Sequence, residues 1–263
     1  SDYHLGSSSS DFTFIHSVGR KWPLPAPVRS YGFPDQVRAY FQNAGFLADL
    51  ELAFEERLRS LYYLGPLRAY PERRYTWAGA QPTDVGRAGE SVVDALLASA
   101  ERGEKISRGA GRKRVTLQEY VAEWLKKLGL IHEFRVRPIA EGSQVFQVVV
   151  KRTADAPEVL ITDVGFGVSQ ILPVLVLCFY VPEGSTIILE QPEIHLHPSV
   201  QAGLADVLID AWQKRSVQII LESHSEHLLR RLQRRVAEEE VTTNDIGLYF
   251  CMNEKGGSRA TPL

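Results

Sequence analysis

The feature that most constrains the fold is an alternation of strand, helix and strand over residues 186–223. An apolar run, Thr186–Glu190, precedes a helical pattern over residues 199–215, and a second apolar run, Val217–Ser223, follows it. The apolar positions of that helix fall on one face: Val200, Leu204, Val207, Leu208 and Ala211. Two strands joined by a helical crossover lie parallel, with a right-handed connection. The sequence therefore predicts an α/β fold whose sheet contains a parallel pair.

Further elements are predicted on both sides of this alternation. We expect helices after Pro34 and over residues 89–102, 117–128, 168–180 and 225–236, and a strand over Ile246–Cys251. Thr116 with Glu119 predicts a capping box, and Gly129 a helix C-terminus. Residues 143–152 and 157–164 predict an antiparallel hairpin, and residues 54–75 predict a strand-like run followed by a loop. The predicted fold class is α/β: a mixed or parallel sheet with flanking helices, plus a helical and β-hairpin insertion.

The composition is that of a globular protein with no dominant charge. Hydrophobic residues make up 44% and the net charge is −2, so global charge does not direct the chain to nucleic acid or to a membrane surface. The longest apolar run, Ile171–Val181, is too short to span a bilayer. Two cysteines in apolar runs, Cys178 and Cys251, fit buried thiols in a reducing compartment. We therefore expect a cytoplasmic protein without a membrane partner.

Polar side chains stand where the two central strands end. The first strand ends at Glu190, and the second ends at Ser223 and His224. Ligands of such sheets bind at the carboxyl ends of the strands, so a carboxylate and an imidazole are expected at one edge. An acid at a strand end is a typical oxygen ligand or water-organising group for Mg²⁺ beside a phosphate. The pattern favours a phosphate-binding site at this edge.

Three sequence blocks occur in a characteristic order between Asp163 and Leu232. They are DVGFGVSQILPVL, TIILEQPEIHLHP and IILESHSEHLLRRL. In this order they resemble the signature motif, the Walker B strand with its D-loop, and the switch-histidine segment of ABC-type ATPases of the RecF, SMC and OLD-nuclease kind. YLGPLRAYPERRY and GRAGE also resemble segments of this family. The resemblance implies ATP and Mg²⁺ as cofactors.

The resemblance implies a role for each motif residue. Glu190 would ligate the metal, and His224 would read the γ-phosphate. The second acid of the family is replaced by Gln191, which can hold water but cannot accept its proton. Three explanations stay open: hydrolysis is slow, Glu193 is the base instead, or Gln191 is an engineered substitution that traps ATP. We favour a natural Gln191 with Glu193 nearby. The signature segment would present backbone N–H groups to a nucleotide held by a partner subunit. Its residues are Gly165, Gly167, Ser169 and Gln170, with Gly165 where the family has serine.

The sequence departs from the family in lacking a G-x-x-x-x-G-K-[ST] loop. The family carries this P-loop upstream of the three blocks, so we expect this chain alone to bind ATP poorly and to be an inactive fragment. Under the resemblance, residues 158–263 are the C-terminal ATPase lobe, residues 61–157 are a helical and β-hairpin region, and residues 1–60 are an irregular and helical remnant of the N-terminal lobe. The relatives imply a homodimer across the ATP site, an effector nuclease or DNA as partner, and DNA repair or anti-phage defence as the setting.

Two other functions remain open from the sequence. One is a metal-dependent phosphoesterase or nuclease that uses a cluster of acids and histidines: Glu190, Glu193, His195, His197, His224 and His227. The other is a nucleotide-gated scaffold without turnover, which Gln191 favours.

Two groups of arginines also allow more than one interpretation. The cluster Arg230, Arg231, Arg234 and Arg235 is a solvated helix face or a DNA-contacting one. A second group lies among tyrosines and consists of Arg68, Arg73 and Arg74. These arginines either stack on the tyrosines as a cation–π cluster within the fold or contact nucleotide or nucleic acid.

Overall fold

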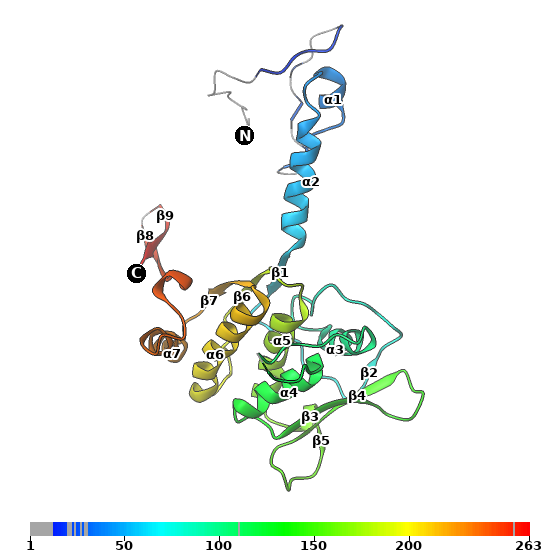
Figure 1. Cartoon of the computed structure of the whole chain (residues 1–263), viewed down its shortest axis with the longest axis vertical. Helices are drawn as coiled ribbons and strands as arrows, with labels where there is room; N and C mark the ends of the chain where they lie inside the picture. Colours follow the sequence, from blue (N-terminus) through cyan, green and yellow to red (C-terminus); the bar gives the residue numbers. More distant parts are fainter. Residues whose placement is uncertain are drawn as a thin grey trace. The chain divides into compact units, whose positions relative to one another are not determined.

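The computed structural model describes residues 13–19, 23, 25–26, 28, 31–109, 111–254 and 256–263 (Figure 1). Most of residues 1–30, which belong to the part predicted to be irregular and helical, lie outside the described residues. The chain forms two compact units, Ser1–Leu61 and Tyr62–Leu263. The boundary predicted at residues 157–158 falls inside the second unit.

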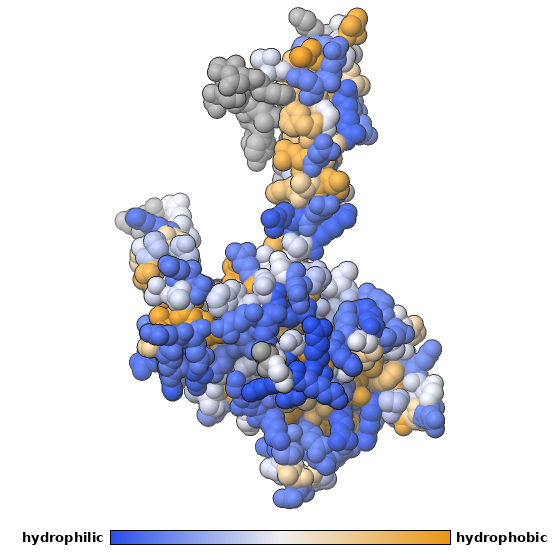
Figure 2. Space-filling model, viewed as in Figure 1, coloured by the Kyte–Doolittle hydropathy of each residue, from blue (hydrophilic) through white to orange (hydrophobic). Residues whose placement is uncertain are grey.

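The first unit is built on two helices, α1 (Gln36–Tyr40) and α2 (Phe46–Arg59). A small core joins them: Val37, Phe41, Ala44 and Leu47. The strand-like run predicted from Phe54 is present only over Leu61–Leu64, because residues 54–59 belong to α2. That segment consists of good helix formers and contains no β-branched residue. Figure 2 shows apolar side chains along the surface of α2, and the exposed ones are Phe46, Leu50, Leu52, Phe54 and Leu58.

The second unit contains a three-stranded sheet in the order β1-β6-β7. Its strands are β1 (Leu61–Leu64), β6 (Thr186–Glu190) and β7 (Gln218–Glu222). β6 and β7 are parallel and in register along their whole length. The crossover between them is α6 (Pro198–Arg215). The predicted α/β fold with a parallel pair and flanking helices is confirmed.

The two faces of the β6–β7 pair have different surroundings. Ile187 and Leu189 of β6 are fully buried in the main core. Residues paired in register point to the same side of a sheet, so the opposite face carries Ile188 with Ile220 and, at the strand ends, Glu190 with Glu222. Ile220 is 51% exposed. Within the described chain this second face is therefore open, although parallel sheets are normally covered on both faces.

Helix α5 (Phe166–Tyr180) forms the centre of the core. Its residues from Val168 to Tyr180 are all buried. Helices α3 (Val92–Glu101), α4 (Leu117–Lys127) and α6 pack around it. A helix that is apolar on every side needs neighbours on every side, and α5 has them.

A second sheet covers the helical insertion. It consists of β2 (Tyr75–Thr76), β3 (Glu133–Pro138), β4 (Val145–Lys151) and β5 (Val159–Leu160), with β4 in the middle. The predicted antiparallel pairing of residues 143–152 with 157–164 is present, but β5 has two residues and continues into a 3₁₀ turn, η1 (Ile161–Asp163). The main partner of β4 is β3, a short charged strand that we did not predict.

The last elements are α7 (Glu226–Ala237), a 3₁₀ turn η2 (Thr243–Asp245) and a terminal hairpin. The hairpin pairs β8 (Tyr249–Glu254) with β9 (Gly257–Pro262). The strand predicted at Ile246 begins three residues later, and β9 was not predicted. Cys251 is exposed in β8, contrary to expectation, whereas Cys178 is buried in α5, and that burial raises the pKa of its thiol to about 12. No described helix is long and apolar enough to cross a membrane.

Replacing Thr116 with alanine is expected to destabilise the second unit by about 1 kcal/mol, the usual cost of losing an N-cap. The predicted capping box is present: the Thr116 hydroxyl accepts the Glu119 N–H, and the Glu119 carboxylate accepts the Thr116 N–H. Urea unfolding followed by circular dichroism measures the loss. Thr153→Ala, at an exposed turn, is the matched control and should change the unfolding free energy by less than about 0.5 kcal/mol.

Candidate functional site

The candidate site lies where β6 and β7 end together. Glu190 and Glu222 are the last paired residues of the two strands, and their side chains share the open face of the sheet. The Gln191 N–H donates to the Glu222 carbonyl oxygen at 2.9 Å, so the backbone pairing extends one residue beyond β6. Two carboxylates therefore stand side by side at the carboxyl edge of a parallel pair, where ligands of such sheets bind.

Glu222 joins Gln191 to His224. Its Oε1 atom accepts a hydrogen bond from Gln191 Nε2 at 3.2 Å and lies 3.3 Å from His224 Nε2. The His224 side chain is 79% exposed and that of Glu222 is 52% exposed, so both are open to a ligand. The sequence predicted that the carboxylate of Glu190 and the imidazole of His224 lie at this edge. The carboxylate that contacts His224 is that of Glu222 instead.

Glu222 was missed, although the sequence contains its signal. The letters IILE occur in both strands, ending at Glu190 and at Glu222. Two parallel strands with the same ending and the same register place equivalent side chains next to each other. Comparing the two strand ends would have identified the second acid.

Glu193 is directed into the protein. The residue is 7% exposed, and its Oε1 accepts the backbone N–H of His224 at 2.8 Å. Its Oε2 is buried without a hydrogen-bond partner. In this arrangement the carboxylate fixes the backbone at His224. The predicted role of Glu193 as a base stays a prediction, and its burial does not favour it.

The histidines after β6 have structural contacts. His195, with φ of 62°, packs its ring against Phe166 at 5.3 Å. His197 is the N-cap of α6 and accepts the Ser199 N–H. Among the described residues, no three His, Cys, Asp or Glu side chains are grouped as metal ligands. The acid and histidine cluster of the nuclease hypothesis is therefore not assembled in the described part of the chain.

The predicted signature segment forms the beginning of α5. Gly165 is the N-cap and has open space around it, and Gly167 lies in the first turn. The Ser169 hydroxyl donates to the Phe166 carbonyl at 2.8 Å, and Gln170 is 2% exposed. The side chains of Ser169 and Gln170 are thus directed inward. The groups that this segment offers to a ligand are the free backbone N–H groups at the helix start.

Comparison with known families gives the same result as the three motif blocks. Residues 103–229 match the AAA ATPase domain family, and this range includes the signature segment, both strand ends and His224. This segment is part of an AAA ATPase domain. The recognition of an ABC-type AAA ATPase from the sequence is thereby confirmed. A search of curated proteins found no match.

Solved structures similar to this ATPase domain include heads of SMC proteins. One is an SMC ATPase from work on ATP-driven dimerisation and DNA-stimulated activation, with 14% identity, a TM-score of 0.41 and coverage of 56% of this chain and 83% of that chain. Another is the SMC head domain from Thermotoga maritima, with 11% identity, a TM-score of 0.38 and coverage of 56% and 47%. A third is the Smc head from Pyrococcus furiosus bound to the C-terminal domain of ScpA, with 13% identity, a TM-score of 0.41 and coverage of 56% and 34%. This chain spans less than half of the last two.

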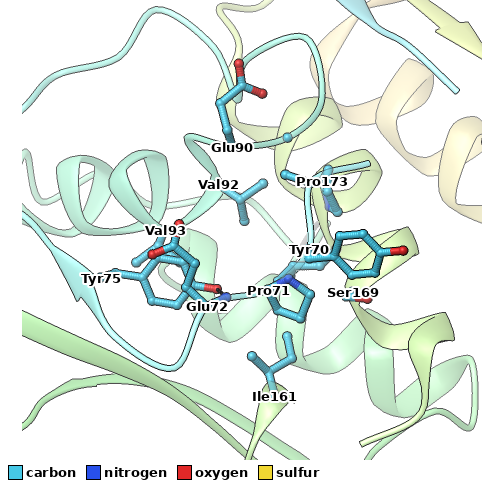
Figure 3. Close-up of a pocket in the computed structure, with 13 residues that line it drawn as sticks. Tyr70, Pro71, Glu72, Tyr75, Glu90, Val92, Val93, Ile161, Ser169 and Pro173 are labelled. Carbon is cyan, nitrogen blue, oxygen red and sulfur yellow. Dashed lines mark hydrogen bonds between the residues drawn. The ribbon is translucent and has the colours of Figure 1, made fainter. Parts of the chain in front are cut away.

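Two further segments of the ATPase resemblance lie against each other. The Gly65 N–H donates to the Arg87 carbonyl at 2.9 Å, and the Ala69 N–H donates to the Ala88 carbonyl at 2.8 Å. YLGPLRAYPERRY and GRAGE are therefore neighbours in space. Figure 3 shows the cleft beside them, lined by Glu72, Glu90 and Ser169 among others. Its volume of about 70 Å³ is too small for a nucleotide.

The arginines of the second unit differ in their partners. Those of the α7 cluster are all ion-paired, with Glu226, Asp206, Glu238 and Glu240. These ion pairs favour the interpretation of the α7 cluster as a solvated helix face over its interpretation as a DNA-contacting face. Arg73 pairs with Asp163 at 2.9 Å, and the cation–π contact in this region is made by Arg87 over Tyr63 at 5.3 Å. Arg68 is buried, and none of its side-chain nitrogens has a hydrogen-bond partner.

Proposed function

We propose that this chain is the catalytic lobe of an ABC-type ATPase head that binds and hydrolyses ATP at the ends of β6 and β7. One observation carries the proposal: two in-register carboxylates, Glu190 and Glu222, share an open sheet face with Gln191 and the exposed His224. Carboxylate oxygens are the ligands that Mg²⁺ prefers, and neither acid is paired with an arginine or lysine in the described chain. The donor set therefore fits a magnesium–nucleotide complex, with Glu190 as the protein ligand. Bound Mg²⁺ supplies charge neutralisation to the phosphates.

Each of the other side chains at this edge has a separate role in the proposed hydrolysis. The Gln191 amide can hold water in place but cannot accept its proton. We assign proton acceptance to Glu222, because its carboxylate is exposed, ionisable and held by the Gln191 amide at 3.2 Å. His224 faces the γ-phosphate position. Glu193 keeps the His224 backbone in place through the 2.8 Å hydrogen bond.

The P-loop is proposed to come from a segment outside this sequence. β7 is the last strand of its sheet, and the face with Ile220 at 51% exposure is open. A further parallel strand and its following helix would cover both this edge and this face, as parallel sheets require. We further propose a homodimer in which the backbone at Gly165, Gly167, Ser169 and Gln170 meets the partner's nucleotide. A cytoplasmic setting in DNA repair or anti-phage defence, with DNA or an effector nuclease as partner, rests on the family resemblance.

The test is steady-state ATP hydrolysis by the natural full-length protein with and without Mg²⁺. Hydrolysis is expected to require Mg²⁺, and Glu190→Gln should lower kcat/KM by about 100-fold or more because the metal loses its protein ligand. Glu141→Gln, in the exposed turn between β3 and β4, is the matched control and should hydrolyse like the wild type. Equal rates for Glu190→Gln and wild type would refute the assignment.

A second candidate is a nucleotide-gated scaffold that does not hydrolyse ATP. The observation in its favour is Gln191 at the position where the family has its second acid. ATP-dependent dimerisation with no phosphate release by the wild type would establish it, and Gln191→Glu would then be expected to introduce turnover.

A further inference from the structure

Arg68 has an ionised group for which the described chain provides no partner. The residue is 7% exposed, and its Nε and both Nη atoms are buried without a hydrogen bond. Two other charged side chains with an unpaired buried atom each keep a hydrogen bond: Arg215 donates to the Val181 carbonyl, and Glu193 accepts the His224 N–H. The remaining unpaired atom, Gln170 Nε2, belongs to an uncharged side chain. Buried charges in proteins are normally paired or coordinated, because an unpaired one loses its hydration without compensation.

The guanidinium is also still charged at neutral pH. Burial lowers the pKa of Arg68 to about 10, and the nearby Tyr63 acts in the opposite direction. No carboxylate contributes to this pKa shift. The structure thus holds a cation, rather than a neutral base, in a position without a counter-charge.

Two neighbours place the segment that contains Arg68 near the edge of the sheet where the candidate site lies. At the start of β1, Tyr62 lies beside Ser185, which immediately precedes β6. Past the end of β1, Tyr70 packs on Phe166 at 5.6 Å, and Phe166 packs on His195 in the turn that follows β6. The segment between these anchors therefore runs along β6 towards its carboxyl end, and Arg68 lies within it.

We propose that Arg68 is a phosphate-binding residue whose guanidinium pairs with a phosphoryl oxygen of the nucleotide. The planar fork of N–H donors matches a phosphate group, and the anion would supply the missing counter-charge. This inference rests on the proposed ATP site and adds a cation to it. The guanidinium would add a positive charge to a site that otherwise offers two carboxylates.

Because Arg68 is 7% exposed, a phosphate reaches its guanidinium only when the segment of residues 65–70 moves. The segment is held by the two backbone hydrogen bonds from Gly65 and Ala69 to residues 87 and 88. Leu67, next to Arg68, is 79% exposed, so the segment is loosely packed at that point. The segment that pairs with it, residues 86–89, turns at Gly86 and Gly89. Their φ angles are +81° and +80°, which glycine adopts freely. Phosphate binding should therefore be coupled to a rearrangement of residues 65–70.

The experiment is a thermal-unfolding titration of this chain with inorganic pyrophosphate and, in a second arm, with ATP, against sodium chloride at equal ionic strength. Wild type should be stabilised saturably by both anions, with ATP binding weakly because this chain lacks the P-loop. Arg68→Gln should bind each about 10–100-fold more weakly, the loss typical of a charged hydrogen-bonded contact. Arg73→Gln, which removes an exposed arginine paired with Asp163, is the matched control and should stay within about twofold of wild type.

Arg68→Met provides a second measurement that does not depend on affinity. Removing an unpaired buried cation should raise the melting temperature without ligand and abolish the response to pyrophosphate. A lower melting temperature for Arg68→Met, or an equal anion response in both Arg68 variants and wild type, would overturn the proposal. Binding to pyrophosphate but not ATP would assign the site to a free phosphate. Failure of the Arg68 proposal can be told apart from failure of the ATPase proposal. If the ATPase proposal fails, Glu190→Gln will hydrolyse ATP like the wild type, whatever anion Arg68 binds.

Discussion

Replacing Glu222 with glutamine is expected to lower kcat for ATP hydrolysis by about 10²–10⁴-fold in the natural full-length protein, the usual contribution of a general base. The glutamine keeps the size of the side chain and can still accept a hydrogen bond from the Gln191 amide. It cannot accept a proton from water. The dissociation constant for ATP, measured in parallel with a fluorescent analogue, should change by less than about threefold, because Glu222 acts on water rather than on the nucleotide.

Glu193→Gln is the matched comparison, since it removes a carboxylate from the turn that follows β6, at the same edge of the sheet. Its amide oxygen can still accept the His224 N–H that Glu193 Oε1 accepts at 2.8 Å, so the backbone at His224 should keep its position. We expect a loss of less than about tenfold. A large loss in Glu193→Gln with near-normal turnover in Glu222→Gln would show that the base is Glu193, and would contradict the assignment made from the structure.

The two strand ends could be predicted because their signals are local. Each is a short apolar run that ends in an acid, and α6 between them has a regular apolar face, so parallel pairing and a shared edge follow from chain connectivity. Thr116 and Glu119 were predictable for the same reason, because a capping box is complete within four residues.

The buried position of the Glu193 side chain could not be predicted, because it depends on how the chain turns after β6. Gln191 and His195 both adopt positive φ, at 42° and 62°, which non-glycine residues do uncommonly. This turn sends Glu193 beneath His224, 31 residues away in the sequence. Alternation along the chain cannot reveal such a contact.

Arg68 illustrates a different limit of sequence reasoning. Arginines among tyrosines suggest stacking, and one such contact exists, but Arg87 makes it. Arg73 is exposed and paired with Asp163, whereas Arg68 is buried and unpaired. Arg68 lies between Gly65 and Ala69, whose backbone N–H groups bond to residues 87 and 88. The sequence contains both segments but not their pairing.

Asp210→Ala is expected to be the most destabilising of the substitutions considered, costing about 3 kcal/mol of unfolding free energy. The Asp210 carboxylate on α6 accepts hydrogen bonds from Tyr120 Oη and, at 3.1 Å, from Trp124 Nε1, both on α4, and it pairs with Lys214 at 2.7 Å. Burial and the hydrogen bond to Asp210 raise the pKa of Tyr120, so its hydroxyl stays protonated and donates. Alanine would leave two buried donors and one ammonium without their acceptor.

The consequence would extend beyond α6, because this carboxylate joins the helical insertion to the crossover that sets the register of β6 and β7. Loss of the contact should therefore weaken the second unit as a whole, and urea unfolding followed by far-ultraviolet circular dichroism measures it. Arg230→Ala breaks an ion pair whose side chains are 71% and 69% exposed, and it should cost less than about 0.5 kcal/mol. Equal stabilities for Asp210→Ala and Arg230→Ala would mean that apolar packing alone holds α4 and α6 together. The polar cluster at their interface would then contribute nothing to the stability of the second unit.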